Sequence, residues 1–597
     1  MSPEAQKRWR EFPRAPEAHF ACFPDLSRLV VQILYNRGIT EPGAVVDFLA
    51  RRWPEDTDPF QLKGMAAAVA RLRQAVDTGE SIAVYGDYDA DGVTATALLT
   101  QTLTTLGAQV HPYIPNRFEE GYGLNKEALA HLAGQGTRLV VTVDCGIRSV
   151  QEVIHGNQLG LDIIITDHHY VGEETPPALA AINPKQPDCR YPFKKLAGVG
   201  LAFKLAQALV QDMQGSNGRQ PSPATEDLLD LVALGTVADL APLTGENRSL
   251  VARGLEHLNQ PRRPGVQMLM VQAGVKPGRV DALTIGFVLG PRLNAAGRLE
   301  SALAAYELLV TEDIFRAGQL AQQLDMQNRE RQSLTQATVE QARQVILEDA
   351  ASRPLYLISQ PSFNTGIVGL VSSRLTEEFY RPTLVAQKGE TLTKGSARSI
   401  PEFHITRALD ECADLLERYG GHSVAAGFTV KNEHVADLEA RLLAIARRDL
   451  AGVQLMPELR IDAELNLRGI NRRRVEDLLS ARSVGRAFDE QDVGLQIVVG
   501  LEQLRPFGEG NPVPVFSTPG LEVKGKRPVG VDGDHLKLVL HDGKQTWDAI
   551  AFRQGSWHDE LPARVNVAYT LEINEWQGRQ RLQLNVKDIK PAASGEG

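Results

Sequence analysis

The stretch of residues 82–92, IAVYGDYDADG, joins a short apolar run to three aspartates and a glycine. The apolar, β-branched run is typical of a strand that is buried on both faces, and Gly92 opens a helical pattern. Asp87, Asp89 and Asp91 therefore follow directly on the end of a buried strand. Carboxylates this close together repel one another unless cations neutralise them, so the stretch predicts a cation at this turn.

Strand-like runs alternate with helical patterns on the C-terminal side of this stretch. The run AQVHPYI is followed by a helix near residues 125–132 and then by the apolar runs RLVVTV and LDIIIT. Such alternation is typical of βαβ units. It predicts an α/β domain built on a parallel sheet.

Acidic and imidazole side chains also follow the two later strands. Asp144 follows the first of them in VVTVDCG, and Asp167, His168 and His169 follow the second in IIITDHH. A further aspartate, Asp239 in ALGTVADLAP, is predicted between a helix and a turn. Ligands of open parallel sheets collect at the carboxyl ends of the strands, so we expect these side chains to converge in one crevice.

The chemistry of this set favours hard divalent cations. Carboxylates with one or two imidazoles and no thiolate suit Mn²⁺ or Mg²⁺ better than structural zinc, and Cys145 is interpreted as core packing. The set is large enough for two ions about 4 Å apart, an arrangement that activates water and clamps a phosphoryl group. A lone aspartate at a strand end is more often a helix cap, but acids at all three strand ends are not expected by chance.

The rest of the chain divides by composition into further segments. Strong helix formers without proline predict one long helix, which precedes a smaller α/β region with a helix near residues 407–419. Beyond it, short strand-like runs spaced by Gly, Asn and Asp predict an all-β barrel. The predicted division is an N-terminal segment 1–50 without an interpretable motif, an α/β domain 51–310, a connecting helix 311–352, a smaller α/β domain 353–450 and a barrel 451–597.

The barrel region contains three of the five tryptophans, Trp547, Trp557 and Trp576. Aromatic side chains on a neutral-to-basic face are suited to stacking on bases. Burial in the barrel core is an equally good interpretation of any one of them.

Composition narrows the class of protein. A chain of 597 residues with 43% hydrophobic and 23% charged residues is expected to fold into several domains. The net charge of −10 argues against a protein that holds nucleic acid through bulk positive charge, so any contact with a polyanion must be local. Four widely spaced cysteines, and no signal-peptide or membrane-length apolar window, favour a soluble cytoplasmic protein.

Four motifs, GDYDADG, VDCG, TDHH and LGTVADL, resemble those of the DHH phosphoesterases, in the same order. Four more, GPRLNAAGRLESA, NTGIVGLVSSRL, KGSARSI and YGGHSVAAGF, are similar to motifs of the RecJ family of 5′ to 3′ exonucleases specific for single-stranded DNA. The resemblance covers nearly the whole chain from Ser81 onward. It implies a DHH domain, a DHHA1 domain marked by GGH, and a C-terminal OB-fold.

The resemblance also implies roles for the strand-end residues. His169 would face the scissile phosphate and stabilise its charge, with Asp144 and Asp91 as its catalytic neighbours and Asp144 as the bridge between two ions. Many members carry a histidine where this chain has Tyr85, and Asp87 is expected to complete the site or orient a ligand. The implied metal ligands are Asp87, Asp89, Asp91, Asp144, His168 and Asp239.

Substrate-binding candidates are arginines and small polar residues in the other motifs. Guanidinium groups match phosphate oxygens bidentately, and glycine-flanked polar clusters bind phosphate through main-chain N–H groups. Taken singly, each arginine is as often a surface ion-pair residue. The resemblance implies that Arg117, Ser396 and Arg398 hold the 5′-terminal phosphate. The full set is Arg117, Arg292, Asn294, Arg298, Ser396, Arg398, Gly420, Gly421 and His422.

The resulting expectation is a divalent-metal exonuclease that releases mononucleotides from single-stranded DNA, with two lobes around a groove too narrow for a duplex. The resemblance implies roles in recombinational, mismatch and base-excision repair, with a RecQ-type helicase and a single-stranded-DNA-binding protein as partners, and we expect a monomer. One alternative is a DHH phosphoesterase for short oligonucleotides, cyclic dinucleotides or polyphosphate, against which the barrel and the long helix argue. The other is an inactive scaffold that binds single strands, against which the retained motif carboxylates argue.

Overall fold

The computed structural model describes residues 7–52, 57–116, 120–121, 123–217, 225–299, 301–348, 353–480, 493–530, 532–576 and 579–592. These residues form two compact units. The first unit comprises residues 46–332 together with 505–512, and the second comprises the residues before 46, residues 333–504 and the residues from 513 onward. Each unit has its own sheet structure.

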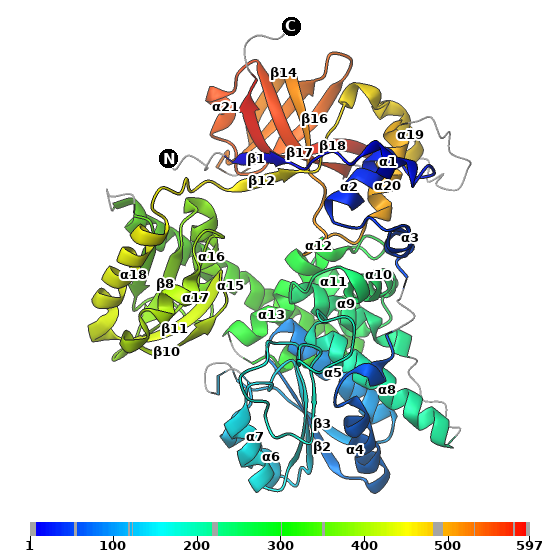
Figure 1. The fold of residues 1–597 in the computed structure, drawn as a ribbon, viewed down its shortest axis with the longest axis vertical. Coiled ribbons are helices and arrows are strands. Elements are labelled where there is room, and N and C mark those ends of the chain that lie inside the picture. The colour runs from blue at the N-terminus through cyan, green and yellow to red at the C-terminus, as the bar shows by residue number, and fades with distance from the viewer. Residues whose placement is uncertain are drawn as a thin grey trace. The chain divides into compact units, whose positions relative to one another are not determined.

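The first unit contains a parallel five-stranded sheet with the strand order β3-β2-β4-β5-β6, drawn in blue and cyan in Figure 1. The predicted parallel α/β fold is confirmed. Side chains along the central strands alternate between two apolar clusters, so that Val84 and Tyr85 face opposite sides. The strands are β2 (Ser81–Gly86), β3 (Gln109–Tyr113), β4 (Leu139–Val143), β5 (Asp162–Thr166) and β6 (Ala180–Ile182).

Helices cover both faces of this sheet. Residues of α4, α5, α8 and α9 pack on one face, and residues of α6 and α7 pack on the other. The helices of the first unit are α4 (Met65–Thr78), α5 (Ala90–Thr105), α6 (Lys126–Gly134), α7 (Val150–Gln158), α8 (Gly198–Asn217), α9 (Leu229–Ala238), α10 (Gly245–Leu258), α11 (Pro264–Gln272), α12 (Ala282–Thr284), the π-helical turn η3 (Ile285–Leu289), α13 (Gly290–Leu299) and α14 (Leu303–Val310).

The segment 505–512 comes from the C-terminal part of the chain but packs in the first unit. The carbonyl of Glu509 accepts a hydrogen bond of 2.7 Å from the main-chain N–H of Leu243. A Cβ on Gly508 would lie 2.6 Å from Cδ1 of Leu243, so any larger residue there would have to displace the side chain of Leu243. The chain then returns to the second unit.

The predicted long helix is present as α15 (Ile314–Glu348), with 35 residues. At about 1.5 Å per residue it spans roughly 53 Å. The boundary between the units falls within this helix. Its C-terminal half contributes Val339, Ala342 and Ile346 to an apolar cluster of the second unit.

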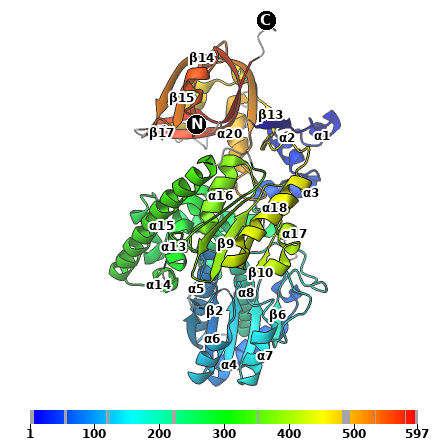
Figure 2. The same cartoon turned by 90° about the vertical axis from the view of Figure 1, so that its left-hand side faces the viewer.

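The second unit contains a mixed five-stranded sheet with the order β10-β11-β9-β8-β7. Helix α16 lies on one face and helices α17 and α18 lie on the other (Figure 2). The elements are β7 (Tyr356–Gln360), α16 (Val368–Phe379), β8 (Thr383–Lys388), β9 (Leu392–Arg398), α17 (Ile405–Asp410), β10 (Leu416–Gly421), β11 (Ala425–Lys431) and α18 (Val435–Asp449).

The helix predicted near residues 407–419 is wrong in its second half. Helix α17 ends at Asp410, and residues 416–421 form the edge strand β10, with Tyr419 opposite Phe428 of β11. The main-chain pairing with β11 provides hydrogen bonds that a local sequence pattern does not reveal.

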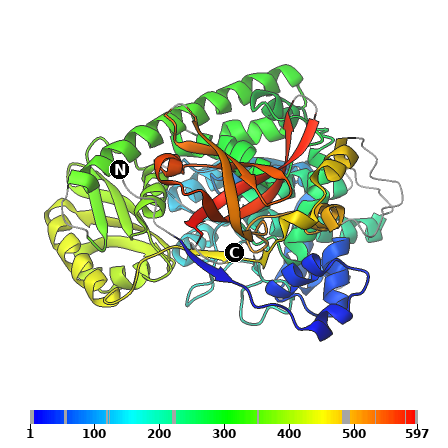
Figure 3. The ribbon, with the colours of Figure 1, turned by 90° about the horizontal axis from the view of Figure 1, so that it is seen from above.

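The C-terminal strands form a closed five-stranded barrel, drawn in orange and red in Figure 3. The strands pair in the order β14-β15-β16-β18-β17, and pairing of β14 with β17 closes the ring, which confirms the predicted barrel. Trp547 is fully buried and its indole N–H donates to Asp542, so this tryptophan is core. The strands are β14 (Phe516–Val529), β15 (His535–His541), β16 (Thr546–Ala551), β17 (Arg564–Trp576) and β18 (Arg579–Pro591), with the helix α21 (Trp557–Glu560) before β17.

The N-terminal residues, for which the sequence offered no interpretation, pack with this barrel unit. Strand β1 (Arg8–Glu11) pairs in parallel with β12 (Glu458–Ile461). The indole N–H of Trp9 donates to Asp588 of β18 at 2.6 Å. The other helices and strands of this unit are α1 (Glu17–Ala21), α2 (Arg28–Asn36), β13 (Ala463–Glu464), α19 (Arg472–Ser480) and α20 (Val493–Gln503), and α3 (Pro42–Ala50) spans the boundary between the two units.

In the part of the chain that the structure describes, no helix has both the length and the apolar character that crossing a bilayer requires.

Candidate metal centre

The turn after β2 is fixed by its own aspartate. Asp89 is the N-cap of α5, and its Oδ1 accepts hydrogen bonds from the main-chain N–H groups of Asp91 at 2.9 Å and Gly92 at 3.0 Å. A Cβ on Gly92 would lie 2.5 to 2.7 Å from main-chain atoms of Asp87. Only glycine therefore allows the turn to close and bring the three carboxylates together.

Asp91 is held by the N-terminus of another helix. Its two carboxylate oxygens accept hydrogen bonds from the N–H groups of Gly198 (2.7 Å) and Val199 (2.8 Å) at the start of α8. A helix N-terminus stabilises a negative charge. A Cβ on Gly198 would lie 2.6 Å from Cβ of Asp144, so this glycine also lets Asp144 approach. The sequence interpretation missed Gly198, whose only signal was a glycine before a helical run in LAGVGLA.

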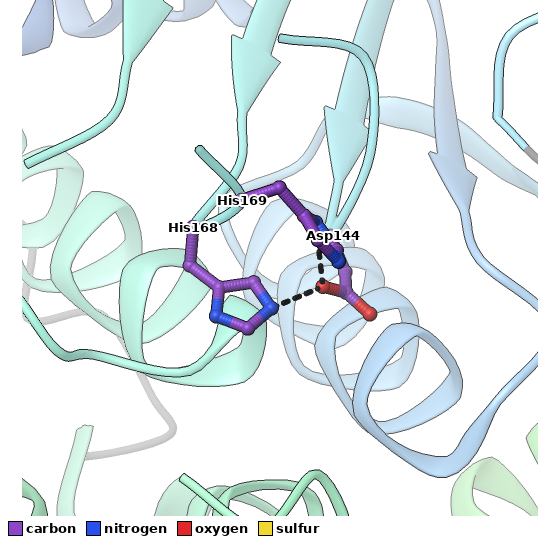
Figure 4. Close-up of side chains that lie close together, drawn as sticks. All are labelled: Asp144, His168 and His169. Carbon is purple, nitrogen blue, oxygen red and sulfur yellow. Dashed lines mark ion pairs between the residues drawn. The ribbon is translucent and has the colours of Figure 1, made fainter. Parts of the chain in front are cut away.

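Asp144 lies at the end of β4 with an unusual backbone. Its φ is +63°, a left-handed conformation that is costly for a residue with a side chain. Its Oδ1 is 3.0 Å from Nε2 of His168 and 4.0 Å from Nδ1 of His169. Figure 4 shows the carboxylate between the two imidazole rings, with dashed lines for these two pairs. The strained turn thus directs the carboxylate toward both histidines.

The two histidines after β5 have different surroundings. The side chain of His168 is 13% exposed, and its Nε2 is 3.9 Å from Oδ2 of both Asp91 and Asp239. The side chain of His169 is 40% exposed, and its Nδ1 lies 2.7 Å from Oδ1 of Asp167. His168 therefore faces the buried acids, and His169 faces outward.

Three overlapping groups of these side chains have the spacing of a metal site. In each group one ligand atom per residue lies within 4.8 Å of the others. Oδ1 of Asp144 and Nε2 of His168 are buried and make no hydrogen bond, as expected for atoms that bind a cation. The donor set therefore fits hard divalent ions. The groups are Asp144, His168 and His169; Asp91, His168 and Asp239; and Asp87, Asp89 and Asp144.

Burial and crowding dominate the electrostatics of the acids. Burial, followed by repulsion from Asp89, raises the pKa of Asp91 to about 7. Burial, followed by repulsion from Asp91, raises the pKa of Asp239 to about 9 and that of Asp144 well above its usual value. A cation is the most direct way to ionise all of them at neutral pH.

The histidines are shifted in opposite directions. Burial lowers the pKa of His168 to about 3, so its imidazole is neutral and can donate a lone pair to a metal. Burial also acts to lower the pKa of His169, but the hydrogen bond and charge of Asp167 outweigh it and raise the pKa. Asp167 itself accepts from the N–H groups of His169 and Ile147. The sequence interpretation noted Asp167 at the strand end but gave it no role.

Tyr85 points away from the acids. Its ring is fully buried, stacks on Tyr113 with centroids 5.0 Å apart, and its hydroxyl donates to the carbonyl of Gly123 at 3.0 Å. Burial raises the pKa of the phenol above its ordinary value. Tyr85 therefore belongs to the apolar core of the sheet, whereas Asp87 belongs to one of the groups of possible metal ligands described above.

Helix α13, predicted to meet the substrate, supports the metal loop. The amide oxygen of Asn294 accepts a hydrogen bond of 2.8 Å from the N–H of Ala90, and a Cβ on Gly297 would lie 2.4 Å from the carbonyl oxygen of Tyr88. The small residues of this motif thus allow a close approach to the protein's own backbone. Arg298 lies one helical turn after Asn294 and hence on the same face.

Arg292 of the same helix makes its hydrogen bonds to other residues of the first unit. Its guanidinium donates to Asp325 at 3.0 Å and to the carbonyl of Val288 at 2.7 Å. The structure therefore gives Arg292 protein partners, whereas the sequence suggested a phosphate.

Most of the remaining candidates gather in the sheet of the second unit. Ser396 and Arg398 lie on β9, and a Cβ on Gly369 at the start of α16 would be 3.4 Å from Oγ of Ser396 and from the guanidinium of Arg398. Among the described residues no carboxylate forms an ion pair with Arg398, and burial lowers its pKa. Gly420 and Gly421 lie on β10, and the N–H of His422 donates to Ala425. Arg117 lies outside the described residues.

Comparison with known proteins gives matches along almost the whole chain. The model of the DHH family N-terminal domain matches residues 81–236, the DHHA1 domain matches 353–450 and the RecJ OB domain matches 487–588. The single-stranded-DNA-specific exonuclease RecJ of Salmonella typhimurium strain LT2 is 35% identical over 99% of this chain and 100% of that protein. RecJ of Bacillus subtilis strain 168 is 38% identical over 94% of this chain and 68% of that protein.

Solved structures agree with these sequence matches. The crystal structure of RecJ in complex with Mn²⁺ from Thermus thermophilus matches with a TM-score of 0.81 and 31% identity, over 99% of this chain and 81% of that one. The Mg²⁺ complex from the same organism matches with a TM-score of 0.75 and 30% identity, over 99% of this chain and 80% of that one. On the strength of its strand-end acids, its barrel and these matches, the chain belongs to the RecJ family.

Proposed function

We propose that this chain is a metal-dependent exonuclease that degrades single-stranded DNA from the 5′ end to mononucleotides. The observation that carries the proposal is the convergence of acids and histidines at the ends of β2, β4 and β5, with buried atoms of Asp144 and His168 that lack hydrogen bonds. Membership of the RecJ family, whose curated members are named as exonucleases specific for single-stranded DNA, supports the same activity.

Two divalent ions, Mn²⁺ or Mg²⁺, would occupy this centre. When bound, they supply the Lewis acidity that activates water and stabilises a phosphoryl group. Asp144 and His168 each belong to two of the three ligand groups, and of the two only the carboxylate of Asp144 has two oxygens to offer, so Asp144 would be the ligand shared by both ions. The ligands would be Asp87, Asp89, Asp91, Asp144, His168 and Asp239.

His169 would contact the scissile phosphate. Its side chain is partly exposed, and its Nδ1 lies 2.7 Å from Oδ1 of Asp167, so the ring is held in a fixed place beside the metal ligands. The carboxylate of Asp167 stabilises the charged imidazolium, and a positive group placed there stabilises the charge that develops on the phosphate. Asp167 would act through His169.

The 5′-phosphate would bind in the second unit. Arg398 has no carboxylate partner among the described residues, and Ser396 and the N-terminus of the 12-residue helix α16 lie beside it. A guanidinium, a hydroxyl and helix N–H groups together form a suitable anion site. Arg117, outside the described residues, and Arg298 on α13 are the further arginines proposed to contact DNA.

The outer face of the barrel would hold the single strand. Arg527 and Lys537 lie directly opposite each other on β14 and β15, and Lys537 lies opposite Ile550 on β16. The ring of Phe552 is 52% exposed and contacts His535 with centroids 5.2 Å apart. Like charges across a strand pair cost stability, which a polyanion would offset. Exposed aromatic and basic side chains together suit stacking on bases without sequence preference.

A role in recombinational, mismatch and base-excision repair is part of this proposal. The partners we propose are a RecQ-type helicase, which would supply the single strand, and a single-stranded-DNA-binding protein.

The decisive test compares substrates on the full chain with Mn²⁺. A long 5′-phosphorylated single strand is expected to be degraded much faster than a duplex or a dinucleotide, with no activity in the Asp144→Ala variant. Preference for the dinucleotide would favour a short-substrate phosphoesterase. Strand binding without hydrolysis would indicate an inactive scaffold.

A further inference from the structure

The turn after β6, residues Asn183 to Lys185, contacts the main chain of both histidines of the metal centre. The side-chain amide of Asn183 donates to the carbonyl of His169 at 2.8 Å. The ammonium of Lys185 donates to the carbonyl of His168. Both consecutive carbonyls are therefore held by residues that no motif of the sequence interpretation included.

Asn183 also links the two bonds to each other. It is fully buried, and its amide oxygen accepts a hydrogen bond of 2.8 Å from the N–H of Lys185. The N–H of Asp167 donates to the carbonyl of Ile182 at 3.1 Å, so the turn begins where β5 and β6 end side by side. A single amide thus ties the turn after β6 to the turn after β5.

The ammonium of Lys185 lies in a defined position. It is 4.6 Å from the ring centroid of Tyr170, and the negative charges of Asp167 and Asp239 attract it. Desolvating an ammonium is costly unless it is paired, so placing it at the edge of an acidic cluster is favourable.

The two imidazoles must point in different directions. Their rings are 4.5 Å apart at an interplanar angle of 59°, with His168 directed toward Asp144 and His169 beside Asp167. Adjacent residues on an unrestrained turn would sample many orientations, and ligands need to be held within about 0.5 Å of the productive geometry. Fixing both carbonyls fixes the Cα–Cβ directions from which the rings extend.

We propose that Asn183 and Lys185 are positioning residues that hold His168 and His169 in the orientation required for divalent-metal binding. The inference rests on the metal centre proposed above. Neither residue belongs to the groups of possible ligands, and both would act through the main-chain carbonyls of the histidines.

The test is Mn²⁺ affinity of the full chain without DNA, measured from the electron paramagnetic resonance signal of free Mn²⁺. Lys185→Met keeps the aliphatic stem and removes the donor. Loss of an outer partner of a metal ligand typically weakens metal binding at least about tenfold, and we expect that loss here. Lys185→Arg restores a donor and is expected to recover most of the affinity.

Lys194→Met is the matched control. Lys194 is also partly buried and donates to a main-chain carbonyl, that of Cys189, at 2.7 Å. Its loss is expected to leave Mn²⁺ affinity unchanged. The melting temperature of each metal-free variant records any general loss of stability.

Lys185→Met with wild-type Mn²⁺ affinity would overturn the inference, and so would an equal loss of affinity in Lys194→Met. If Lys185→Met does not fold, Asn183→Ser is judged by the same rule, because serine is too short to reach the carbonyl of His169. Failure of the wild-type chain to bind Mn²⁺ would instead refute the metal centre, and with it the proposed function.

Discussion

Nδ1 of His169 lies 2.7 Å from Oδ1 of Asp167, and the same carboxylate oxygen accepts the main-chain N–H of His169 at 3.0 Å. Because Asp167 is buried and also bonded to Ile147, it cannot follow the ring if the ring turns. The pair therefore fixes both the direction and the charge of the imidazole.

Asp167→Asn is expected to lower kcat by about 10² and to leave Mn²⁺ affinity within a few-fold. The substitution removes the negative charge that stabilises the His169 imidazolium, the group proposed to contact the scissile phosphate. Asp167 raises the pKa of His169, so the variant should lose activity at a lower pH than the wild type as pH rises. The pH profile of kcat measures this. An unshifted alkaline limb would exclude a protonated His169 from the reaction.

Gly198→Ala is expected to weaken Mn²⁺ binding at least about tenfold, since its Cβ would lie 2.6 Å from Cβ of Asp144 and displace that carboxylate. Gly134→Ala is the control, because a Cβ there meets no atom within 4 Å. Calorimetric titration with Mn²⁺ checks both. Equal affinity in the two variants would argue against Asp144 as a ligand.

The metal-free chain is expected to lose stability as pH rises. The unfolded carboxyls ionise near 3.8, whereas the folded pKa values are about 7 for Asp91 and about 9 for Asp239. Between these limits the folded state binds more protons, so its stability is full below about 3.8 and falls as pH rises above it; the contribution of Asp91 is lost by about pH 7 and that of Asp239 by about pH 9. Melting temperatures across this range measure the slope, which Asp239→Asn or saturating Mn²⁺ should reduce. A slope that Asp239→Asn leaves unchanged would mean that other groups in the chain cause it.

Phe552→Ala is expected to weaken binding of a single strand by roughly 5- to 150-fold, the effect of losing one stacked base of about 1 to 3 kcal/mol. Lys537→Ala is expected to weaken binding and to reduce the slope of log affinity against log salt by about one. Fluorescence anisotropy without divalent metal measures both. Phe60→Ala, an exposed aromatic residue of the first unit, is the control. Unchanged binding in both barrel variants would place the strand on another surface.

Arg398→Ala is expected to reduce the rate on 5′-phosphorylated strands by about tenfold or more and to leave the rate on 5′-hydroxyl strands nearly unchanged, because a bidentate guanidinium–phosphate contact is lost. The ratio of the two rates is the readout. Lys394→Ala, an exposed lysine of the same strand, should keep the wild-type ratio. A constant ratio in Arg398→Ala would rule out a 5′-phosphate site there.

The strand-end acids could be predicted from the sequence because parallel strands bring their carboxyl ends to one edge. This rule and the recognition of buried strands are enough to predict that the side chains of Asp87, Asp144 and His168 lie close together. The left-handed backbone of Asp144 could not be predicted, since a positive φ is uncommon for aspartate and the stretch offers Gly146 as the more obvious residue to adopt one.

Contacts between residues that lie far apart in the chain could also not be predicted from the sequence. The hydrogen bond from Ala90 to Asn294 joins residues 204 positions apart, and no local pattern indicates it; the predicted role of this motif in substrate binding stays a prediction. Strand β10 exists because β11 pairs with it, and helix propensity alone favoured the wrong element.

The return of residues 505–512 to the first unit means that the polypeptide passes from one unit to the other four times, at residues 45–46, 332–333, 504–505 and 512–513. Two units joined by one linker can be separated by a single cut in the gene or in the polypeptide. Two units connected by four chain crossings cannot be separated in this way and are inherited together. A single proteolytic nick at any one crossing would still leave them covalently connected.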